Sequence, residues 1–252
     1  MRFASLGSGS SGNATLIEAD GTRLLIDCGF SIKETVKRLQ RFELTPNDLD
    51  ALLVTHEHSD HLSGVAPLAR RYNFPVWMTH GTYRKARDVK IPNLKLFHAH
   101  QNFQIGALTV RPFPVPHDAA EPCQFVFEQD KQKFGLLTDL GSITPFVVKS
   151  LAGCDALLLE CNHDRDMLRN GPYPDYLQAR VGGNYGHLEN SQAADLLQRM
   201  DRSRLKKLAL GHLSEKNNRP ELALAAVQKV IGEPEWLTVL DQQQGGEWQK
   251  LT

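Results

Sequence analysis

The run from Thr55 to His61 (Thr-His-Glu-His-Ser-Asp-His) most constrains what this chain can fold into. Its four candidate metal ligands are His56, His58, Asp60 and His61. The run directly follows the apolar stretch 51–54, which predicts a buried strand, and precedes residues 62–72, which predict a helix. A strand that ends in such a turn directs imidazoles and a carboxylate toward one point. Imidazole binds zinc well and carboxylate also admits manganese, so the run predicts a metal site.

The bulk composition fits an ordinary folded domain. The chain has 252 residues, of which 41% are apolar. This length fits one large or two small domains, and the lack of an obvious linker favours a single domain over residues 1–252. The formal net charge is zero. No global field therefore draws the protein to nucleic acid or to a membrane, and binding to nucleic acid would need a local patch.

The sequence predicts a cytoplasmic protein that does not enter a membrane. Residues 1–7 lack the apolar core of a signal peptide, and no apolar run approaches the ~18 residues that span a bilayer. The four cysteines form no CxxC pair, which fits reduced thiols in a reducing compartment. Cys28 and Cys161 each lie beside a candidate site residue, and we interpret both as small buried residues rather than ligands.

Predicted helices occur early and late around a long β-rich middle. The segments with strand-like composition are residues 3–6, 15–19, 23–26, 51–54, 75–78, 107–113, 123–128, 133–138, 155–159 and 205–210. The predicted helices run from a capping box at Ser31 through about Arg41, and over residues 62–72, 191–200 and 220–231. This order predicts an α/β (α+β) fold, an αββα sandwich of two mixed sheets with helices outside.

Three further candidate ligands each follow a predicted strand. His117 comes after residues 107–113, Asp139 after 133–138 and His212 after 205–210. A single strand-end acid usually belongs to a turn, but three such residues together with the run at 56–61 indicate a shared site. Asp27 also ends a strand, and it is either an outer carboxylate of that site or a turn residue.

With these residues in this order, the chain resembles the metallo-β-lactamase fold superfamily. The resemblance implies one metal held by His56, His58 and His117 and a second held by Asp60, His61 and His212. It further implies that Asp139 bridges the metals and that Asp27 orients a ligand imidazole from outside the ligand set. The two divalent ions would be zinc or manganese, and iron is also possible.

Five separated motifs narrow the resemblance to the YycJ/WalJ branch of that superfamily. They cover residues 8–13, 160–164, 171–174, 186–190 and 211–218. The branch is associated with 5′-to-3′ exonuclease activity on DNA, which implies a DNA partner. One departure is Glu189, where the branch pattern has serine, and a carboxylate there would weaken phosphate binding and change substrate preference.

The implied chemistry is hydrolysis. Two metals ~3.5–4 Å apart can share a hydroxide, which Asp60 would orient, and clamp the oxygens of a phosphodiester. His163 and His187 lie outside the ligand set and either protonate a leaving oxygen, grip a phosphate or serve as buried structural histidines. The tentative phosphate-binding turn consists of Ser8, Gly9, Ser10, Ser11, Gly12 and Asn13, which form either an anion nest or a flexible hairpin turn.

Two other functions compete with a nuclease. A small-molecule hydrolase acting on a lactone, thioester or cyclic phosphodiester fits the neutral net charge, but gives His163 and His187 no obvious use. A catalytically silent metal-binding module is disfavoured because all seven ligand positions are filled. The residues alone leave the physiological metal, DNA against RNA, the polarity of digestion and the oligomeric state open.

Overall fold

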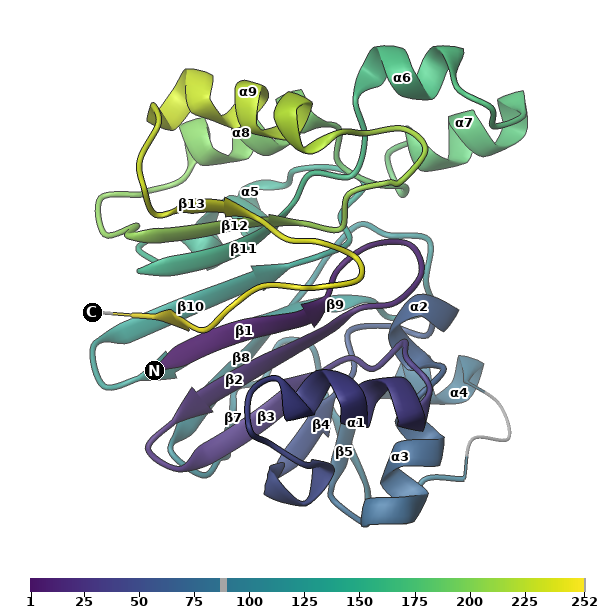
Figure 1. The fold of residues 1–252 in the computed structure, drawn as a ribbon, viewed down its shortest axis with the longest axis vertical. Helices are drawn as coiled ribbons and strands as arrows, with labels where there is room; N and C mark the ends of the chain where they lie inside the picture. The colour runs from purple at the N-terminus through teal and green to yellow at the C-terminus, as the bar shows by residue number, and fades with distance from the viewer. Residues whose placement is uncertain (87–89, 252) are drawn as a thin grey trace.

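The computed structural model describes residues 1–86 and 90–251. Two seven-stranded sheets pack face to face, with helices on both outer faces (Figure 1). Both sheets mix parallel and antiparallel pairs, which confirms the predicted αββα sandwich. No helix in the described ranges is long and apolar enough to cross a membrane.

The first sheet is antiparallel on one side of β3 and parallel on the other. Its strands, in spatial order, are β14 (Gln249–Lys250), β1 (Arg2–Gly7), β2 (Ala14–Ala19), β3 (Thr22–Ile26), β4 (Ala51–Leu53), β5 (Val76–Thr79) and β6 (Leu94–Phe97). The carboxyl ends of β1, β3 and β4 therefore lie along one edge of this sheet.

The second sheet repeats that plan around β10. Its strands, in spatial order, are β13 (Leu237–Val239), β12 (Lys207–Gly211), β11 (Ala156–Glu160), β10 (Gln132–Leu137), β9 (Cys123–Gln129), β8 (Leu108–Pro114) and β7 (Phe103–Ile105). Since β8, β10, β11 and β12 run in the same direction, their carboxyl ends also share an edge.

The helices form two outer layers (Figure 1). On the first sheet lie α1 (Ile32–Gln40), α2 (Ser59–Leu62), α3 (Val65–Tyr72) and α4 (His80–Lys85), with a short 3₁₀ turn at Pro46–Asp48. On the second sheet lie α5 (Pro145–Leu151), α8 (Asn190–Arg199) and α9 (Pro220–Ile231). Beyond α8 stand α6 (Arg165–Asn170) and α7 (Asp175–Val181).

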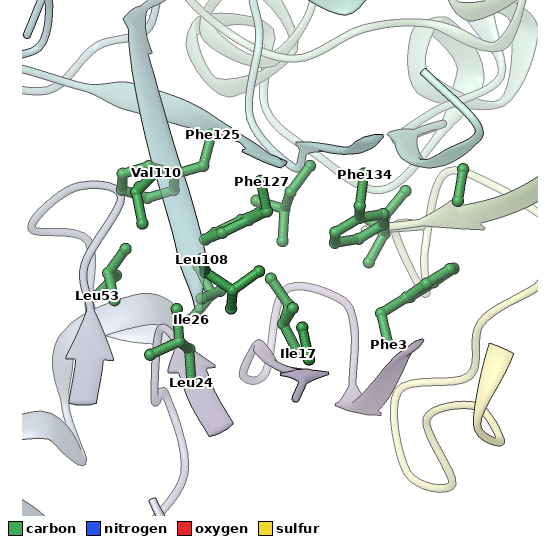
Figure 2. Packing of buried hydrophobic residues seen from close by; sticks show 14 of the residues in the cluster. Phe3, Ile17, Leu24, Ile26, Leu53, Leu108, Val110, Phe125, Phe127 and Phe134 are labelled. Carbon is green, nitrogen blue, oxygen red and sulfur yellow. The ribbon is translucent and has the colours of Figure 1, made fainter. Parts of the chain in front are cut away.

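The central core fills the space between the two sheets. Figure 2 shows Phe3, Ile17 and Leu24 of the first sheet facing Phe127 and Phe134 of the second. The Phe3 and Phe134 rings stack with their centroids 4.3 Å apart. Full burial of one such side chain contributes about 1.5–3 kcal/mol, so this layer fixes the two sheets against each other. The sheet edges that carry the candidate ligands are thereby held in register.

The helix predicted over residues 62–72 is instead two helices, α2 and α3, with a break at Ser63 and Gly64. The amide of Gly64 donates to the carbonyl of Cys28 at 2.8 Å. A Cβ on Gly64 would lie 1.9 Å from the carbonyl oxygen of Phe30. This close approach of two backbones ends α2 early and ties it to the loop after β3.

The strands absent from the sequence prediction are β6, β7, β13 and β14. All four are edge strands, and each is two to four residues long. Edge strands have one neighbour and bury little, so neither alternation nor a continuous apolar run marks them. All the strands that the sequence does predict are confirmed, with shifts of one or two residues at their ends.

Candidate metal centre

All seven predicted ligands lie beyond the carboxyl ends of strands at the shared edges, five in loops and Asp60 and His61 in the short helix α2. Asp27 follows β3, the run at 55–61 follows β4, and His117, Asp139 and His212 follow β8, β10 and β12. Asp27 and His212 adopt left-handed backbone conformations, with φ of 59° and 54°. This conformation is uncommon outside glycine and turns each side chain away from the strand direction.

His56, His58 and His117 form the first ligand group. Their ligand atoms lie within 4.8 Å of one another. His58 Nδ1 is 3.2 Å from His117 Nε2, so these two nitrogens converge on one point. His56 Nε2 is buried and has no hydrogen-bond partner among the described residues. These are the same three residues that the family resemblance implies as ligands of the first metal.

Asp60, His61 and His212 form the second group. Asp60 Oδ2 lies 3.3 Å from His61 Nε2 and 3.4 Å from His212 Nε2. Asn13 also approaches, because its Nδ2 donates to Asp60 Oδ2 at 3.2 Å. This second triad again matches the implied ligand set.

Asp139 lies between the two groups. Its Oδ2 is 3.1 Å from His61 Nε2, and its Oδ1 is 3.7 Å from His117 Nε2. The carboxylate is buried, and Oδ2 has no hydrogen-bond donor in the described part of the chain. Asp139 is therefore in the position that a bridging ligand requires.

Each ligand imidazole has its second nitrogen beside an acceptor. The pairs are His56 Nδ1 with Thr55 Oγ1 (2.9 Å), His61 Nδ1 with Asp27 Oδ2 (2.7 Å), His117 Nδ1 with Gly186 O (2.9 Å), His212 Nδ1 with Thr138 O (2.5 Å) and His58 Nε2 with Asp118 Oδ1 (3.5 Å). Metal-binding histidines show this arrangement almost always, because the outer acceptor fixes the tautomer and the ring orientation. Asp27 thus has the predicted outer-carboxylate position.

The residues fit two divalent cations. Five imidazoles and two carboxylates converge, and two of their buried atoms, His56 Nε2 and Asp139 Oδ2, lack a hydrogen-bond partner. A buried polar atom without a partner costs about 1–3 kcal/mol, so such atoms in a native structure require an explanation. Cations between the groups would satisfy both atoms. The mixed imidazole and carboxylate set suits zinc, manganese or iron.

The electrostatics of the site favour the ligand forms of His56, Asp60 and Asp139. Burial opposes protonation of His61 and His212, but the neighbouring carboxylates outweigh it and raise the pKa of both imidazoles well above the usual value. Burial, reinforced by His61, lowers the pKa of His56 well below its usual value, so His56 is a neutral ligand. Burial opposes ionisation of Asp60 and Asp139, but the neighbouring imidazoles His61 and His212 outweigh it and hold both carboxyl pKa values low. Both acids are therefore ionised at neutral pH.

The ligand groups open into a cavity of about 280 Å³. Ser10, His58, Ser59, Asp60, Asp118, Asp139, Arg180, Val181, Gly186, His187 and His212 line it. The metal groups thus form its floor, while the segment around α7 forms part of its wall.

Of the two candidate catalytic histidines outside the ligand set, His187 is the one that lines the cavity. Its Nδ1 lies 2.7 Å from Glu160 Oε1 and 3.5 Å from Asp139 Oδ1. Glu160 is fully buried, and its Oε2 accepts from the amides of Leu140 and Leu188 at 2.9 and 3.2 Å. Sequence analysis did not assign Glu160, although it ends β11, between the strands that carry Asp139 and His212.

His163 does not line the cavity. Its side chain is buried, and burial lowers its pKa to about 4, so it is neutral at pH 7. Its carbonyl accepts from Asn190 at the start of α8. Its Nδ1 is buried and has no hydrogen-bond partner among the described residues, so the catalytic and the structural role of His163 both stay predictions.

Most amides of the loop 8–13 are used inside the fold, so they are not available to an anion. The amides of Gly9, Ser11 and Gly12 donate to Asn13 Oδ1, Gln242 Oε1 and Gly9 O. Ser8 Oγ accepts from the amide of His212 at 2.8 Å. The loop therefore holds the second ligand group in place, and Ser10 is its one member on the cavity wall.

Glu189 does not bring a carboxylate into the cavity. It is the N-cap of α8, where it forms a capping box with Gln192, and its Oε2 lies 3.1 Å from Arg165 Nε. The departure from serine at this position therefore adds an ion pair at a helix start. The predicted weakening of phosphate binding is not supported by these contacts.

Asp118 and Arg180 are cavity residues that sequence analysis missed. Arg180 Nε donates to Asp118 Oδ2 at 2.5 Å, and Asp118 Oδ1 faces His58. The two residues are 62 positions apart, so no local pattern connects them. The only signal in the sequence for this pair is that Asp118 directly follows the candidate ligand His117.

Comparison with known proteins agrees with this geometry. Residues 22–208 match the family model described as beta-lactamase superfamily domain. Exodeoxyribonuclease WalJ of Streptococcus pneumoniae is 36% identical over 88% of this chain and 85% of its own length. Exodeoxyribonuclease YycJ of Bacillus anthracis is 37% identical over 92% of this chain and 90% of its own length.

Among solved structures, the metallo-β-lactamase fold protein YhfI from Bacillus subtilis has a TM-score of 0.79 and 16% identity, over 99% of both chains. That likeness concerns the fold, whereas the two sequence relatives extend over most of the chain at higher identity. This chain therefore belongs to the metallo-β-lactamase superfamily, in the branch that contains WalJ and YycJ.

Proposed function

We propose that the protein is a dinuclear metal-dependent phosphodiesterase, and more narrowly an exonuclease that digests DNA from 5′ to 3′. The observation that carries the proposal is that His187, which is paired with the buried Glu160, lines the same cavity as members of both ligand groups. The relatives WalJ and YycJ, both named exodeoxyribonucleases, support DNA as the substrate. A DNA substrate and four buried thiols both fit a cytoplasmic location.

The candidate ligands would hold the metal ions that act as electrophiles in this chemistry. Two divalent cations, zinc or manganese with iron as a further possibility, would neutralise phosphate oxygens and would lower the pKa of bound water toward about 7. His56, His58 and His117 would hold one cation, and Asp60, His61 and His212 the other. Asp60 also lines the cavity, where it can accept a hydrogen bond from the attacking water and orient it.

His187 supplies the proton for the leaving oxygen. Glu160 occupies the Nδ1 side of the ring, which leaves Nε2 for the substrate. Imidazole is the side chain that most often transfers protons near neutral pH. Because Glu160 is held by two backbone amides, the ring that it orients has a fixed direction.

The size of the cavity favours a strand end over a continuous duplex. About 280 Å³ lies just below the range of about 300–1,000 Å³ for small-ligand pockets, so it admits roughly one nucleotide. The same volume also suits a small phosphodiester, lactone or thioester, which keeps a small-molecule hydrolase as the second candidate.

A time course on end-labelled DNA tests the proposal. Single- and double-stranded DNA with label at the 5′ or the 3′ end is incubated with Mn²⁺, Zn²⁺ or chelator. We expect metal-dependent release of mononucleotides from the 5′ end, with loss of activity in chelator.

The matched controls are Asp139→Ala and His58→Ala, which remove the central and the first-group ligand. Both are expected to abolish release while the circular dichroism spectrum stays that of the wild type. If no strand is cut with any metal, the proposal is wrong, and a panel of small esters, lactones and cyclic phosphodiesters follows.

A further inference from the structure

We propose that Arg180 binds a backbone phosphate of the DNA strand at the mouth of the metal cavity, and that Asp118 positions it there. The same carboxylate of Asp118 lies beside the candidate ligand His58, so it links the phosphate contact to the first ligand group. The inference rests on the proposed nuclease function and adds to it a residue that selects an anionic substrate over an uncharged lactone or thioester.

The cavity wall carries one side chain with a permanent positive charge. Among the described residues that line the cavity, Arg180 is the only arginine or lysine. Its side chain is 59% exposed, compared with 22% for His187, so the guanidinium lies at the mouth of the cavity rather than on its floor. Arginine stays charged at every working pH and presents a planar fork that matches phosphate oxygens. A phosphate that enters the cavity therefore meets a protein cation in addition to any metal ion.

Asp118 holds one side of the guanidinium and leaves the other side available. Its Oδ2 accepts a hydrogen bond from Arg180 Nε at 2.5 Å. Arg180 Nη1 and Nη2 make no hydrogen bond within residues 1–86 and 90–251. The ion pair therefore fixes the direction of the guanidinium, while two amino groups remain for the oxygens of a phosphate.

The second oxygen of Asp118 faces the first ligand group. Asp118 Oδ1 lies 3.5 Å from His58 Nε2 and 3.6 Å from His117 Nε2. An outer carboxylate beside a ligand imidazole fixes the orientation of its ring and raises its basicity. One carboxylate is thus shared by Arg180 and the first ligand group.

The backbone after α7 packs closely against the cavity, which fixes the position of Arg180. No residue of α7 is buried, so burial of the helix does not anchor this side chain. The amide of His187 donates to the carbonyl of Val181 at 2.8 Å. A Cβ on Gly141 would lie 2.4 Å from the carbonyl oxygen of Asn184. The loop that follows Arg180 therefore has little room to shift relative to the cavity.

The exposed position of Arg180 indicates which phosphate it meets. The ligand groups lie on the floor of the cavity, so the scissile phosphate would be held there. The volume of about 280 Å³ admits roughly one nucleotide. A cation at the mouth therefore faces a neighbouring phosphate of the same strand. We expect one linkage beyond the cut, and not the scissile linkage, to depend on Arg180.

The test is a coupling between Arg180 and single charged linkages. Full-length protein with Mn²⁺ is given 5′-labelled DNA, as a single strand and as a duplex, with or without one uncharged methylphosphonate at the second, third or fourth linkage from that end. In the wild type, one of these methylphosphonates is expected to raise the KM for release of the label roughly 10- to 100-fold, the range for one hydrogen bond to a charged group. In Arg180→Gln, the KM for unmodified DNA should rise by the same factor, and that methylphosphonate should raise it no further.

Two further arginine variants are the controls. Arg165→Gln removes a cation from α6, where Arg165 lies 3.1 Å from Glu189 and does not line the cavity. It is expected to keep the wild-type KM and the wild-type methylphosphonate effect. Arg180→Lys keeps the charge but loses the fork, so its KM should lie between those of the wild type and Arg180→Gln. Circular dichroism and metal content establish that each variant is folded and loaded.

Asp118→Asn tests the positioning role with a measurement that does not depend on turnover. Competition with a chromophoric chelator gives the affinity for Zn²⁺. Loss of the charge beside His58 is expected to weaken Zn²⁺ binding roughly 10- to 100-fold, the range for outer partners of metal ligands, whereas Arg180→Gln should keep the wild-type affinity. The KM of Asp118→Asn for DNA should rise toward that of Arg180→Gln. Wild-type zinc affinity and KM in Asp118→Asn would contradict the positioning role.

The outcomes separate the two proposals. If the wild type releases the label but Arg180→Gln has the wild-type KM, or if no methylphosphonate raises the wild-type KM, the phosphate contact is wrong and the nuclease stands. The contact is also wrong if Arg180→Gln keeps the full methylphosphonate effect. If the wild type releases no label from either form of DNA, the proposed nuclease function fails, and the phosphate contact fails with it.

Discussion

At the residue scale, the imidazole of His187 depends on a carboxylate that lies behind it. Glu160 is fully buried, and its two oxygens are used separately, one for His187 and one for two backbone amides. Burial of a polar group without partners is costly, and Glu160 avoids this cost because both of its oxygens have hydrogen-bond partners. The contacts of Glu160 therefore fix the orientation of the His187 ring.

We expect His187→Ala to lower kcat roughly 10²- to 10⁴-fold with little change in KM, because it removes the proton donor. Glu160→Gln should lower kcat by a smaller factor, since the ring remains but loses its orienting charge. Steady-state kinetics on a labelled single strand measures both effects. Glu128→Gln is the matched control, since Glu128 pairs with Arg111 away from the cavity. Wild-type kcat in His187→Ala would remove this residue from the mechanism.

At the element scale, the break between α2 and α3 at Ser63 and Gly64 fixes the short helix that carries Asp60 and His61. The loop after β3 packs against this break, with Gly64 N donating to Cys28 O. On its other side the amide of Cys28 donates to the carbonyl of His61 at 2.8 Å. The break thus links two ligands to the loop that carries Asp27.

We expect Gly64→Ala to destabilise the fold by about 3 kcal/mol or more, because a Cβ there would meet backbone atoms that cannot rotate away. Urea unfolding gives the free energy of unfolding. Ser63→Ala, at the exposed neighbouring position, is the control and should change that free energy by no more than about 0.5 kcal/mol. A Gly64→Ala variant as stable as the wild type would show that the loop moves freely.

At the scale of the whole molecule, the four free cysteines are all buried, so the fold shields their thiols from reagents in the solvent. Burial raises the pKa of Cys28 to about 11 and that of Cys154 to about 12, and it also raises the pKa of Cys123 and Cys161. A raised pKa means that the folded state keeps its thiol protons to a higher pH than the unfolded state does. The thiols therefore favour the folded state below pH 9, and this contribution falls as pH rises toward 11.

We expect native protein to be unreactive toward a thiol reagent between pH 7 and 8, because the thiolate is the reactive form and the thiols are buried. In guanidinium chloride all four cysteines should react. A colorimetric thiol count with and without denaturant measures the difference. Rapid labelling of the native protein at pH 8 would contradict this expectation and would indicate that the layers open.

The candidate site divides into a part that sequence patterns predict and a part that they do not. The seven candidate ligands and Asp27 were predicted because they follow apolar strands or share the close spacing of the run at 56–61, and both are local signals. Glu160 has the same position after β11, yet its role depends on which strands neighbour it. The loop 8–13 was interpreted as a possible anion nest, because the sequence does not show that Gln242 and Asn13 accept from its amides.

The sequence by itself therefore determined the sandwich fold, the family and the set of candidate metal ligands, since hydrophobic periodicity and ligand spacing are set within a few residues. The tertiary structure decided which partner each ligand imidazole has, which extra histidine reaches the cavity, and that Asp118 and Arg180 complete its wall. These contacts join residues tens of positions apart through the register of two packed sheets. That register follows from the packing of the whole core, and no short stretch of sequence contains it.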